Sequence, residues 1–383
     1  MILSSFVYLS FAFILYKLGA IIHNLKIYRS SNITYKHVLI FTFVLFALIS
    51  GLRYRVGADY IPYYKYFYQV CNGGYIDSIF SGFEPIFVFV TKILSSFNSV
   101  ILYFATWAFI QIYFTYHALK NRSYLYPFLG LILILGPYYL SWMNGIRQTM
   151  AACIFIWAST LLVDKRKIFS YICIIIITSF LHKSALLLLI FIFLPQKNWL
   201  PNRYICIIIL LSCAICGQLA IIRDHLDFAE NILQNLGYDS YANSFDNILS
   251  LDDTQRAYGP RRIVLLLSSI LILWYKDDMK SLYKDKFFTY SLNLFFIYCC
   301  STDLLSNVSN LFLRPFLYLE PFALISTAYL LTYLKIRYGI YRKKSYIFWF
   351  ALFCSCSYLM IDCIANINTP NEYSLYKFIF LEI

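Results

Sequence analysis

Charged residues are scarce in this sequence. Only 13% of its 383 residues are Asp, Glu, Lys or Arg, 61% are hydrophobic, and the mean hydropathy is +0.65. Soluble domains carry about 25% charged residues, so this composition excludes a soluble protein of this length. Acids are rarest, with 19 against 32 Lys and Arg. The basic residues lie in short loops between hydrophobic runs, as the positive-inside rule predicts, and therefore do not indicate a nucleic-acid partner.

Motifs for common cofactors and metals are also missing. The chain has no Walker loop, no GxGxxG and no HExxH, so nothing in it indicates a bound cofactor or metal. Its 11 Cys give no disulfide framework, because all but Cys71 lie in apolar stretches. The pair Cys213 and Cys216 indicates packing rather than metal or redox chemistry. Residues 1–22 lack a basic leading region and are interpreted as a first membrane span, not a cleaved signal peptide.

Long hydrophobic runs dominate the sequence. A membrane-spanning helix needs about 20 apolar residues, and these runs predict an all-α, polytopic integral membrane protein. We expect one membrane domain over residues 1–383, with about 11–14 transmembrane or half-membrane helices. The expected spans lie near residues 1–22, 37–52, 99–118, 124–141, 146–163, 204–222, 262–275, 287–305, 311–334 and 345–363. Two further segments are irregular: 84–97 is short, and 168–195 is too long for one span and short for two.

Three short polar signatures interrupt the hydrophobic chain. They are Gly51-Leu52-Arg53-Tyr54-Arg55-Val56-Gly57-Ala58-Asp59-Tyr60, Asn144-Gly145-Ile146-Arg147-Gln148 and Leu181-His182-Lys183-Ser184. An Arg or Lys at the centre of a membrane helix costs about 2.5–3.5 kcal/mol. Polar groups kept at the ends and breaks of spans therefore indicate a functional site rather than a scaffold.

Clusters of basic residues predict the orientation in the membrane, because they favour the cytoplasmic side. They lie at residues 165–167, 276–286 and 335–344. Counting spans from them places residues 142–147 and the long loop 223–260 outside. The segment 168–195 then begins and ends inside, which predicts a hairpin of two half-length helices with His182 near its tip.

The N-terminal spans have two possible arrangements. Residues 84–97 either dip into the membrane and return on the outer side, which leaves 53–84 as an external loop, or cross fully, which reverses the first loops. The first arrangement is favoured, because it places Lys26, Arg29 and Lys36 inside. It also brings the three polar signatures to one face.

The first signature places two arginines beside an acid. Asp59 follows Arg53 and Arg55 directly after a span, and Gly57 permits a tight backbone between them. A carboxylate flanked by Arg stays ionised, so Asp59 is a candidate to orient a hydroxyl group or to act as a base. The alternative is an interfacial cap held by an Arg–Asp pair.

The second signature opens the expected helix 146–163. A helix N-terminus presents free N–H groups and the positive end of the helix dipole, and Arg147 and Gln148 add donors there. This pattern indicates a site for a pyrophosphate group. The alternative is a polar cap at the start of the helix.

The remaining candidates lie at the hairpin tip and in the span 311–334. His182 stands at the break of the hairpin, where a histidine can transfer protons near neutral pH; the alternative is a turn whose histidine bonds the backbone. Arg314 sits against an apolar span and is a candidate anion ligand. Glu320 is an intramembrane acid and therefore a candidate site residue.

Arginine is enriched over lysine on the predicted outer side. Because Arg forms bidentate contacts with phosphate and carboxylate groups, this bias indicates an anionic ligand. For several of these arginines the alternative is contact with lipid headgroups or pairing with nearby acids. They are Arg223, Arg256, Arg261 and Arg262, with Asp224, Asp227 and Asp252 as the expected partners.

The order of the motifs GLRYRVGADY, FEPIF, NGIRQTMA, FLHKSALLLLIFIFL and LFLRPF resembles the EpsG-like family of exopolysaccharide and O-antigen polymerases (Wzy-type), roughly over residues 37–335. This resemblance implies a multi-pass protein of the bacterial inner membrane that polymerises undecaprenyl-pyrophosphate-linked oligosaccharide units at the outer face. A flippase and a chain-length regulator of the same pathway are the expected partners, besides the lipid bilayer. The family's motif positions correspond to Arg53, Asp59, Arg147, Gln148 and His182. The family often has Thr where this chain has Ala58.

The resemblance suggests a mechanism. A growing glycan on lipid pyrophosphate is the donor, and Arg147, with Arg53 or Arg314, stabilises the charge that develops on the leaving group. Asp59, Glu320 or His182 takes the proton from the acceptor sugar hydroxyl. No metal is required, because arginine supplies the positive charge.

Two other functions remain open. The first is a polyprenyl-linked glycosyltransferase or an O-antigen ligase, which uses the same lipid donor and a different acceptor. The second is a flippase or transporter for the lipid-linked glycan. A transporter typically has internal repeats and a polar path on both sides, whereas this sequence has no evident repeat and its signatures are expected on one face.

Overall fold

The computed structural model describes residues 2–28, 32–73, 82–194, 199–219, 259–306, 310–339, 343–367 and 373–381. The predicted external loop 223–260 lies outside these residues except for its last two positions, as do residues 74–81 of the loop 53–84.

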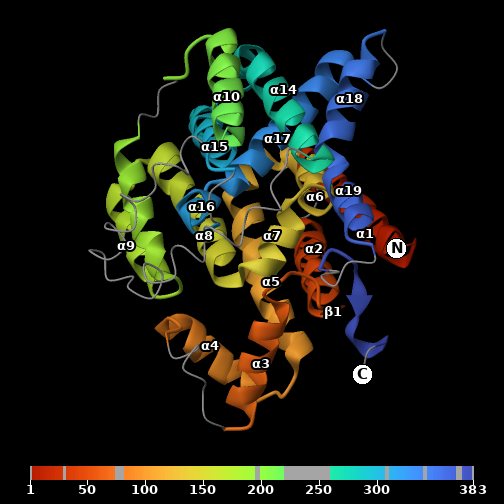
Figure 1. The fold of residues 1–383 in the computed structure, drawn as a ribbon, viewed down its shortest axis with the longest axis vertical. Helices are drawn as coiled ribbons and strands as arrows, with labels where there is room; N and C mark the ends of the chain where they lie inside the picture. Colours follow the sequence, from red (N-terminus) through yellow and green to blue (C-terminus); the bar gives the residue numbers. More distant parts are fainter. Residues whose placement is uncertain are drawn as a thin grey trace.

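Helices make up nearly all of the described structure (Figure 1), which confirms the all-α prediction. The first nine are α1 (Ile2–Ile27), α2 (Asn32–Gly51), α3 (Tyr60–Cys71), α4 (Pro85–Ser95), α5 (Val100–Ala118), η2 (Lys120–Leu125), α6 (Tyr126–Leu135), α7 (Tyr138–Asn144) and α8 (Ile146–Lys165). They are followed by α9 (Ile168–Ser179), η3 (Lys183–Phe193), α10 (Arg203–Gln218), α14 (Pro260–Tyr283), α15 (Lys286–Leu304), α16 (Asn310–Leu317), α17 (Glu320–Tyr338), α18 (Ser345–Cys356), α19 (Tyr358–Ala365) and η5 (Ile379–Leu381). In the described part of the chain, the strands β1 (Arg53–Tyr54) and β2 (Lys377–Phe378) form one antiparallel pair.

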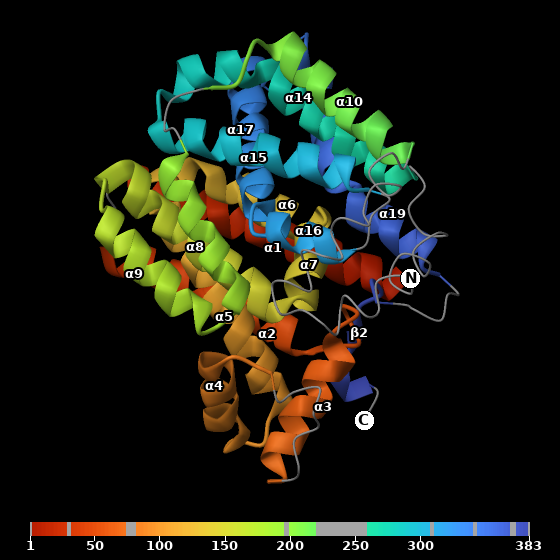
Figure 2. The same cartoon turned by 60° about the vertical axis from the view of Figure 1, so that its left-hand side comes forward.

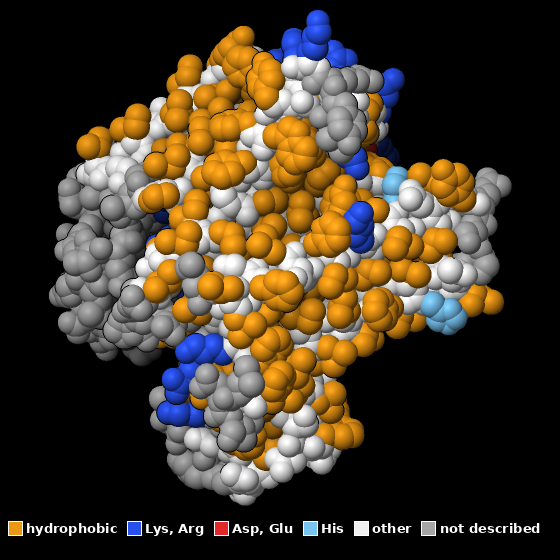
Figure 3. Space-filling model, turned by 90° about the vertical axis from the view of Figure 1, so that its right-hand side faces the viewer, with side chains coloured by type: hydrophobic (Ala, Val, Ile, Leu, Met, Phe, Trp, Pro, Cys, Tyr) orange, Lys and Arg blue, Asp and Glu red, His pale blue; other side chains and the backbone are white. Residues whose placement is uncertain are grey.

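Several of these helices have the length and composition of membrane spans. In the described residues, Ile2–Ile27, Ile33–Gly51 and Ile146–Asp164 qualify individually, and the number rises from 3 to 5 if each of two bent helix pairs counts as one span. Much of the face in Figure 3 is covered by hydrophobic side chains, with Lys and Arg gathered mainly toward its edges. A surface of this kind is typical of a protein in contact with lipid, so the chain is a polytopic membrane protein.

Some predicted spans are broken by proline. The expected span 124–141 divides at Pro137 into α6 and α7, which meet at 65°, because proline lacks a backbone N–H and clashes with the preceding turn. The expected span 311–334 divides into α16 and α17, with Pro321 in the first turn of α17. The expected span 345–363 also bends, by 43° between α18 and α19, but there is no proline at this break.

The hairpin predicted for residues 168–195 is present. It consists of α9 and the 3-10 helix η3, with His182 in an extended conformation between them. The Tyr171 hydroxyl donates to the carbonyl of Leu188 at 2.5 Å and ties the two halves together. The prediction of two half-length helices with His182 at the tip is confirmed.

Helices α1 and α6 approach each other closely at two glycines. A Cβ on Gly19 would lie 2.6 Å from the backbone of Tyr126, and a Cβ on Gly130 would lie 2.8 Å from the Cβ of Leu15. Small residues allow membrane helices to pack at such distances, where van der Waals contact supplies most of the stabilisation. This crossing holds α1 against the centre of the bundle, where Tyr8 and Phe11 are buried.

A buried ion network joins four elements at the end of the bundle that carries the basic loops. The Arg122 guanidinium of η2 donates to Asp164 of α8 at 3.0 Å and to Asp285, which precedes α15, at 2.5 and 2.8 Å. The Tyr329 hydroxyl of α17 also donates to Asp285, at 3.0 Å. The network satisfies the charge of Arg122, a residue that is only 6% exposed, and places residues 120–122, 164–167 and 284–286 at one end.

Helices α3 and α4 and the first turns of α5 form a small lobe beside the main bundle (Figure 1, Figure 2). Its core is aromatic, with Phe67 stacked on Tyr103 at 4.9 Å and Phe87 on Trp107 at 5.0 Å between ring centroids. Helix α4 has 11 residues, about 16 Å at 1.5 Å per residue, which is too short to cross a hydrocarbon core of about 30 Å. This length favours the arrangement in which residues 84–97 do not cross the membrane.

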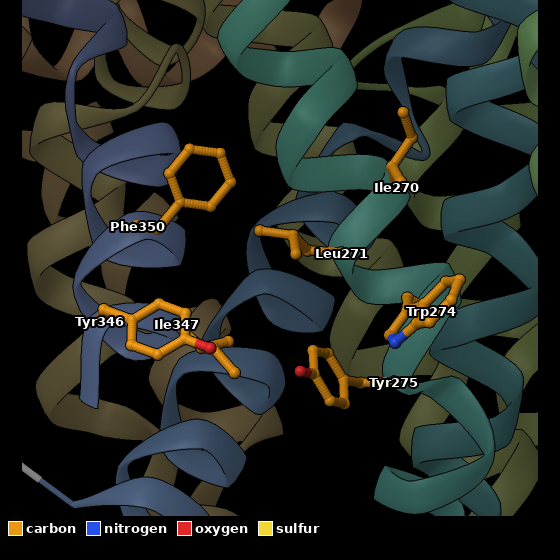
Figure 4. A pocket seen from close by; sticks show the side chains of 7 residues that line it. All are labelled: Ile270, Leu271, Trp274, Tyr275, Tyr346, Ile347 and Phe350. Atoms are coloured by element: carbon orange, nitrogen blue, oxygen red, sulfur yellow. The ribbon is translucent and has the colours of Figure 1, made fainter. Parts of the chain in front are cut away.

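An apolar groove of about 570 Å³ lies between α14 and α18 (Figure 4). It is lined by Ile270, Leu271, Trp274, Tyr275, Tyr346, Ile347 and Phe350. None of these residues belongs to the polar signatures, so the groove is not part of the candidate site described next.

Candidate functional site

A single buried carboxylate, that of Glu84, lies at the centre of the candidate site. Its side chain is 5% exposed and forms an ion pair with the Arg147 guanidinium through Oε2. Its Oε1 lies 3.1 Å from His182 Nδ1 and accepts the backbone N–H of Lys183, also at 3.1 Å. Glu84 therefore connects the second signature with the third.

The local structure explains why these residues meet. Glu84 is the N-cap of α4, with Pro85 in the first turn, a position that suits proline because its missing N–H is not needed there. The next backbone N–H, that of Ile86, donates to the carbonyl of Phe180 at 3.0 Å. The start of α4 is thus fixed against the tip of the hairpin, beside the start of α8.

Arg147 is held by aromatic contacts as well as by charge. Its guanidinium carbon lies 4.1 Å from the ring centroid of Phe83 and 5.6 Å from that of Phe87, and such cation–π contacts are worth about 0.5–2 kcal/mol. The side chain is 20% exposed. Glu84 engages Nη1 and Nε is buried, so an anionic ligand would have to bond the remaining N–H groups of the guanidinium.

The electrostatics keep Glu84 ionised. Burial raises the pKa of its carboxyl group, but the hydrogen bonds from His182 and Lys183 and the charge of Arg147 outweigh burial and lower the pKa from 4.5 to about 2. At neutral pH the group is therefore a carboxylate that only accepts hydrogen bonds.

The first signature docks against the second. The backbone N–H of Asp59 donates to Asn144 Oδ1 at 2.8 Å. Gly57 has a φ of +89°, and a Cβ there would lie 3.0 Å from the carbonyl oxygen of Met143, so this turn requires glycine. Burial raises the pKa of Asp59, while the charges of Arg314 and Arg147 oppose the rise. The arginines that act on Asp59 are thus Arg314 and Arg147 rather than the Arg53 and Arg55 that flank it in the sequence, and its role in the site stays a prediction.

Helix α16 joins the cluster through its backbone. The side-chain amide of Gln148 donates to the carbonyl oxygen of Arg314, and the hydroxyls of Ser184 and Tyr318 lie 2.8 Å apart. The Arg314 side chain is exposed, and its charge opposes the rise that burial causes in the pKa of Asp59. The fold thus brings together five predicted site residues that lie far apart in the sequence: Asp59, Arg147, Gln148, His182 and Arg314.

Two predicted site residues lie elsewhere. Arg53 is 1% exposed; it donates to the carbonyl oxygens of Ser50 at 2.5 Å and Val56 at 3.4 Å, and its guanidinium carbon lies 4.4 Å from the Phe104 ring centroid. Glu320 is 4% exposed and accepts a hydrogen bond from the Ser141 hydroxyl at 2.6 Å. A catalytic or pyrophosphate-binding role for either residue stays a prediction.

The sequence analysis did not select Glu84 as a site residue. In the sequence, Glu84 begins the irregular segment 84–97 and lies in the FEPIF motif of the family resemblance, but no site role was predicted for it. The available signal was an acid immediately before Pro85 in a chain with few acids. Its partners could not be inferred, because His182 is 98 residues away along the chain.

Arg261 and Arg262, for which the sequence predicts the outer side, pair with acids other than those expected. Arg261 forms an ion pair with Asp362, and Arg262 lies 3.2 Å from Asp303. These contacts tie the start of α14 to α19 and α15. The acids expected as partners and the arginines at 223 and 256 lie outside the described residues. In the part of the chain that the structure describes, no group of three or more His, Cys, Asp or Glu could hold a metal ion.

These features define a polytopic, all-α membrane protein in which three polar signatures form one cluster of charged residues around a buried carboxylate. The chain belongs to the EpsG family, whose family model matches residues 36–378. EpsG is a Wzy-type polymerase family, and membership indicates a glycosyltransferase-like polymerase of polysaccharide biosynthesis. The match extends beyond the expected 37–335 and includes both β1 and β2. No curated protein and no solved structure matches the chain.

Proposed function

We propose that this protein polymerises undecaprenyl-pyrophosphate-linked oligosaccharide units at the outer face of the bacterial inner membrane. The observation that carries the proposal is that Glu84 joins Arg147 and His182, while the charge of the same Arg147 also acts on Asp59. The cluster combines cations for an anionic leaving group with groups able to accept a proton. It lies at the other end of α8 from the Arg122–Asp164 pair, which supports an outer location.

In the proposed reaction, the oxygen of an acceptor sugar hydroxyl attacks the anomeric carbon of the growing glycan. The bond from that carbon to the pyrophosphate oxygen breaks, and undecaprenyl pyrophosphate leaves with the bonding electrons. Arg147 and the exposed Arg314 stabilise this negative charge, and Gln148 fixes the backbone of Arg314 by its hydrogen bond.

The hydroxyl proton passes to a base, and His182 is the best placed of the three candidates. It adjoins Arg147 through Glu84 and has a side chain that is 22% exposed. Burial raises the pKa of Asp59, and the charges of Arg314 and Arg147 only partly offset that rise; with its backbone N–H fixed by Asn144, Asp59 suits an acceptor-orienting carboxyl group. Glu320 is nearly inaccessible and bonded to Ser141, so it is the least favoured base.

The other proteins of the pathway that this polymerase would work with follow from its proposed substrate. We propose that a flippase supplies the lipid-linked units and that a chain-length regulator acts on the same polymer, whether that polymer is exopolysaccharide, capsule or O-antigen. The donor lipid is expected to enter from the bilayer.

The test is turnover by the purified protein in vesicles with synthetic undecaprenyl-pyrophosphate-linked repeat units. The proposal predicts a ladder of products that increase by one unit, with release of undecaprenyl pyrophosphate. Transfer of a single glycan to lipid A core would indicate a ligase instead. Movement of the intact lipid across the bilayer without new glycosidic bonds would indicate a flippase. Either result without a ladder would contradict the proposal.

A further inference from the structure

We propose that Glu84 is a positioning residue that fixes His182 as the neutral tautomer with hydrogen on Nδ1, so that Nε2 is free to accept the proton in the reaction. This inference rests on the proposed function and adds a residue to its mechanism. Glu84 acts through His182 and does not itself contact substrate.

The tautomer follows from the hydrogen-bond partners. Glu84 Oε1 lies 3.1 Å from His182 Nδ1, and a carboxylate that forms an ion pair with Arg147 has no hydrogen to donate. Nδ1 must therefore carry the hydrogen and donate it. A neutral imidazole has only one N–H, so its lone pair is on Nε2, and the partner of one ring nitrogen sets the state of the other.

The Glu84 carboxylate forms its hydrogen bonds with the hairpin and with α8 rather than with the first turn of its own helix. An acid at an N-cap commonly accepts a backbone N–H from its own first turn, but the Glu84 side chain makes no such bond. It accepts instead from His182, Lys183 and Arg147. Three donors from two other segments fix the orientation of a side chain that is 5% exposed.

The same contacts also hold Arg147, so a loss of activity in a Glu84 variant has two possible origins. If activity falls because Arg147 is misplaced, binding and stabilisation of the anionic lipid are weakened whichever residue occupies position 182. If activity falls because His182 is misplaced, the Glu84 substitution has an effect only while His182 is present. A double-mutant cycle separates these origins.

The activity test measures kcat and KM for the wild type, Glu84→Gln, His182→Gln and the double variant at matched protein levels. Loss of an orienting carboxylate in a comparable carboxylate–histidine arrangement costs about 10⁴-fold in kcat. We expect a fall in kcat of about 10²–10⁴-fold for Glu84→Gln, and no more than a small further loss when this change is added to His182→Gln. An equal loss in both backgrounds, or a fully active Glu84→Gln, would overturn the proposal.

If Glu84→Gln does not accumulate, Glu84→Asp provides the same test. It keeps the charge but withdraws the carboxylate by one methylene, so kcat should fall in the wild-type background and change little beside His182→Gln. The same fall in both backgrounds would contradict the positioning role.

A second measurement does not depend on turnover. The chain has five His, and replacing the other histidines with Gln leaves His182 alone for selective ¹⁵N labelling. At a pH where the ring is neutral, the ¹⁵N spectrum should show a protonated Nδ1 and a bare Nε2, and Glu84→Gln should increase the population with hydrogen on Nε2. If the protein makes polymer but His182 carries its hydrogen on Nε2, the positioning role of Glu84 is wrong and the proposed function still holds. If the hydrogen is on Nδ1 but the protein makes no polymer, the proposed function is wrong and the positioning of His182 still holds.

Discussion

The contacts of the single residue Arg147 stabilise its partly buried charge and also suit it to bind a pyrophosphate. A guanidinium at the start of a membrane helix is stabilised here by the Glu84 carboxylate and by the ring of Phe83. Arginine is more weakly hydrated than lysine and stacks on aromatic rings, so it suits this position. Its planar fork also matches the oxygens of a pyrophosphate.

Arg147→Lys is therefore expected to remove most polymerisation while the protein still inserts into the membrane. Lys keeps the charge but lacks the planar fork, and loss of one such stabilising donor costs about 10²–10³-fold in rate. Polymer length should be measured at equal membrane protein levels. Arg203→Lys is a matched control, because Arg203 lies 3.8–3.9 Å from Asp277 and Asp278, away from the cluster. Full-length polymer from Arg147→Lys would remove Arg147 from the site.

Residue types could be predicted from the sequence more readily than their contacts. Arg147, Gln148 and His182 stand at span ends or breaks, where a polar residue is costly without a reason. Arg53 shares this pattern, yet its guanidinium points inward onto Phe104. Glu84 was missed because its importance depends on segments that meet only in the folded chain.

At the scale of elements, the C-terminal strand β2 holds the first signature in place. Phe378 pairs with Arg53 and Lys377 with Tyr54, and the N–H of Gly57 donates to the carbonyl of Tyr373 at 3.0 Å. The hydroxyl of Tyr8 in α1 donates to the carbonyl of Ser374 at 3.0 Å. The strand thus links the loop that carries Asp59 to the first helix.

A disulfide between residues 54 and 377 should therefore form and stabilise the protein. Paired residues of an antiparallel ladder have Cα atoms about 4.5–5.5 Å apart, within the range of a disulfide. In a cysteine-free background, oxidation of Tyr54→Cys with Lys377→Cys should raise the thermal midpoint, since disulfides typically contribute about 2–4 kcal/mol. The reduced double variant and each single variant are the controls. Failure to cross-link under oxidation would contradict the pairing.

Truncation after residue 372 should have the opposite effect. Without Tyr373 and β2, the turn at Gly57 loses its backbone partner and β1 loses its paired strand, so the loop that carries Asp59 is no longer fixed and polymerisation should decrease. Polymer length in the cross-linked protein should match the wild type. A truncated protein with normal polymer length would show that the strand is dispensable for the site.

The breaks in the helices follow partly from the sequence. Pro137 and Pro321 are visible markers of interruption, but hydropathy alone merged the segments on either side of them into single spans. The hairpin of α9 and η3 was predicted because its length and its central His182 could not be reconciled with one span. The aromatic lobe of α3 and α4 could not be predicted, since it depends on ring contacts between distant segments.

At the scale of the whole molecule, charge divides the protein into two ends. One end carries the Arg122 network and the contact of Arg203 with Asp277, together with the basic loops that favour the cytoplasm. The other carries the cluster around Glu84. Composition and loop charge predict that the two ends differ in charge, because the membrane imposes this on every span; the side of the membrane that each end faces stays a prediction.

The central claim is that the three polar signatures share one aqueous side, opposite the basic loops. Single cysteines at residues 144, 182 and 166 in a cysteine-free background, exposed to an impermeant maleimide on intact spheroplasts, test it most directly. We expect 144 and 182 to be labelled from outside and 166 to be labelled only after permeabilisation, which also serves as the control that each cysteine is reactive. Labelling of 166 but not of 144 from outside would contradict this expectation and show the opposite orientation of the protein.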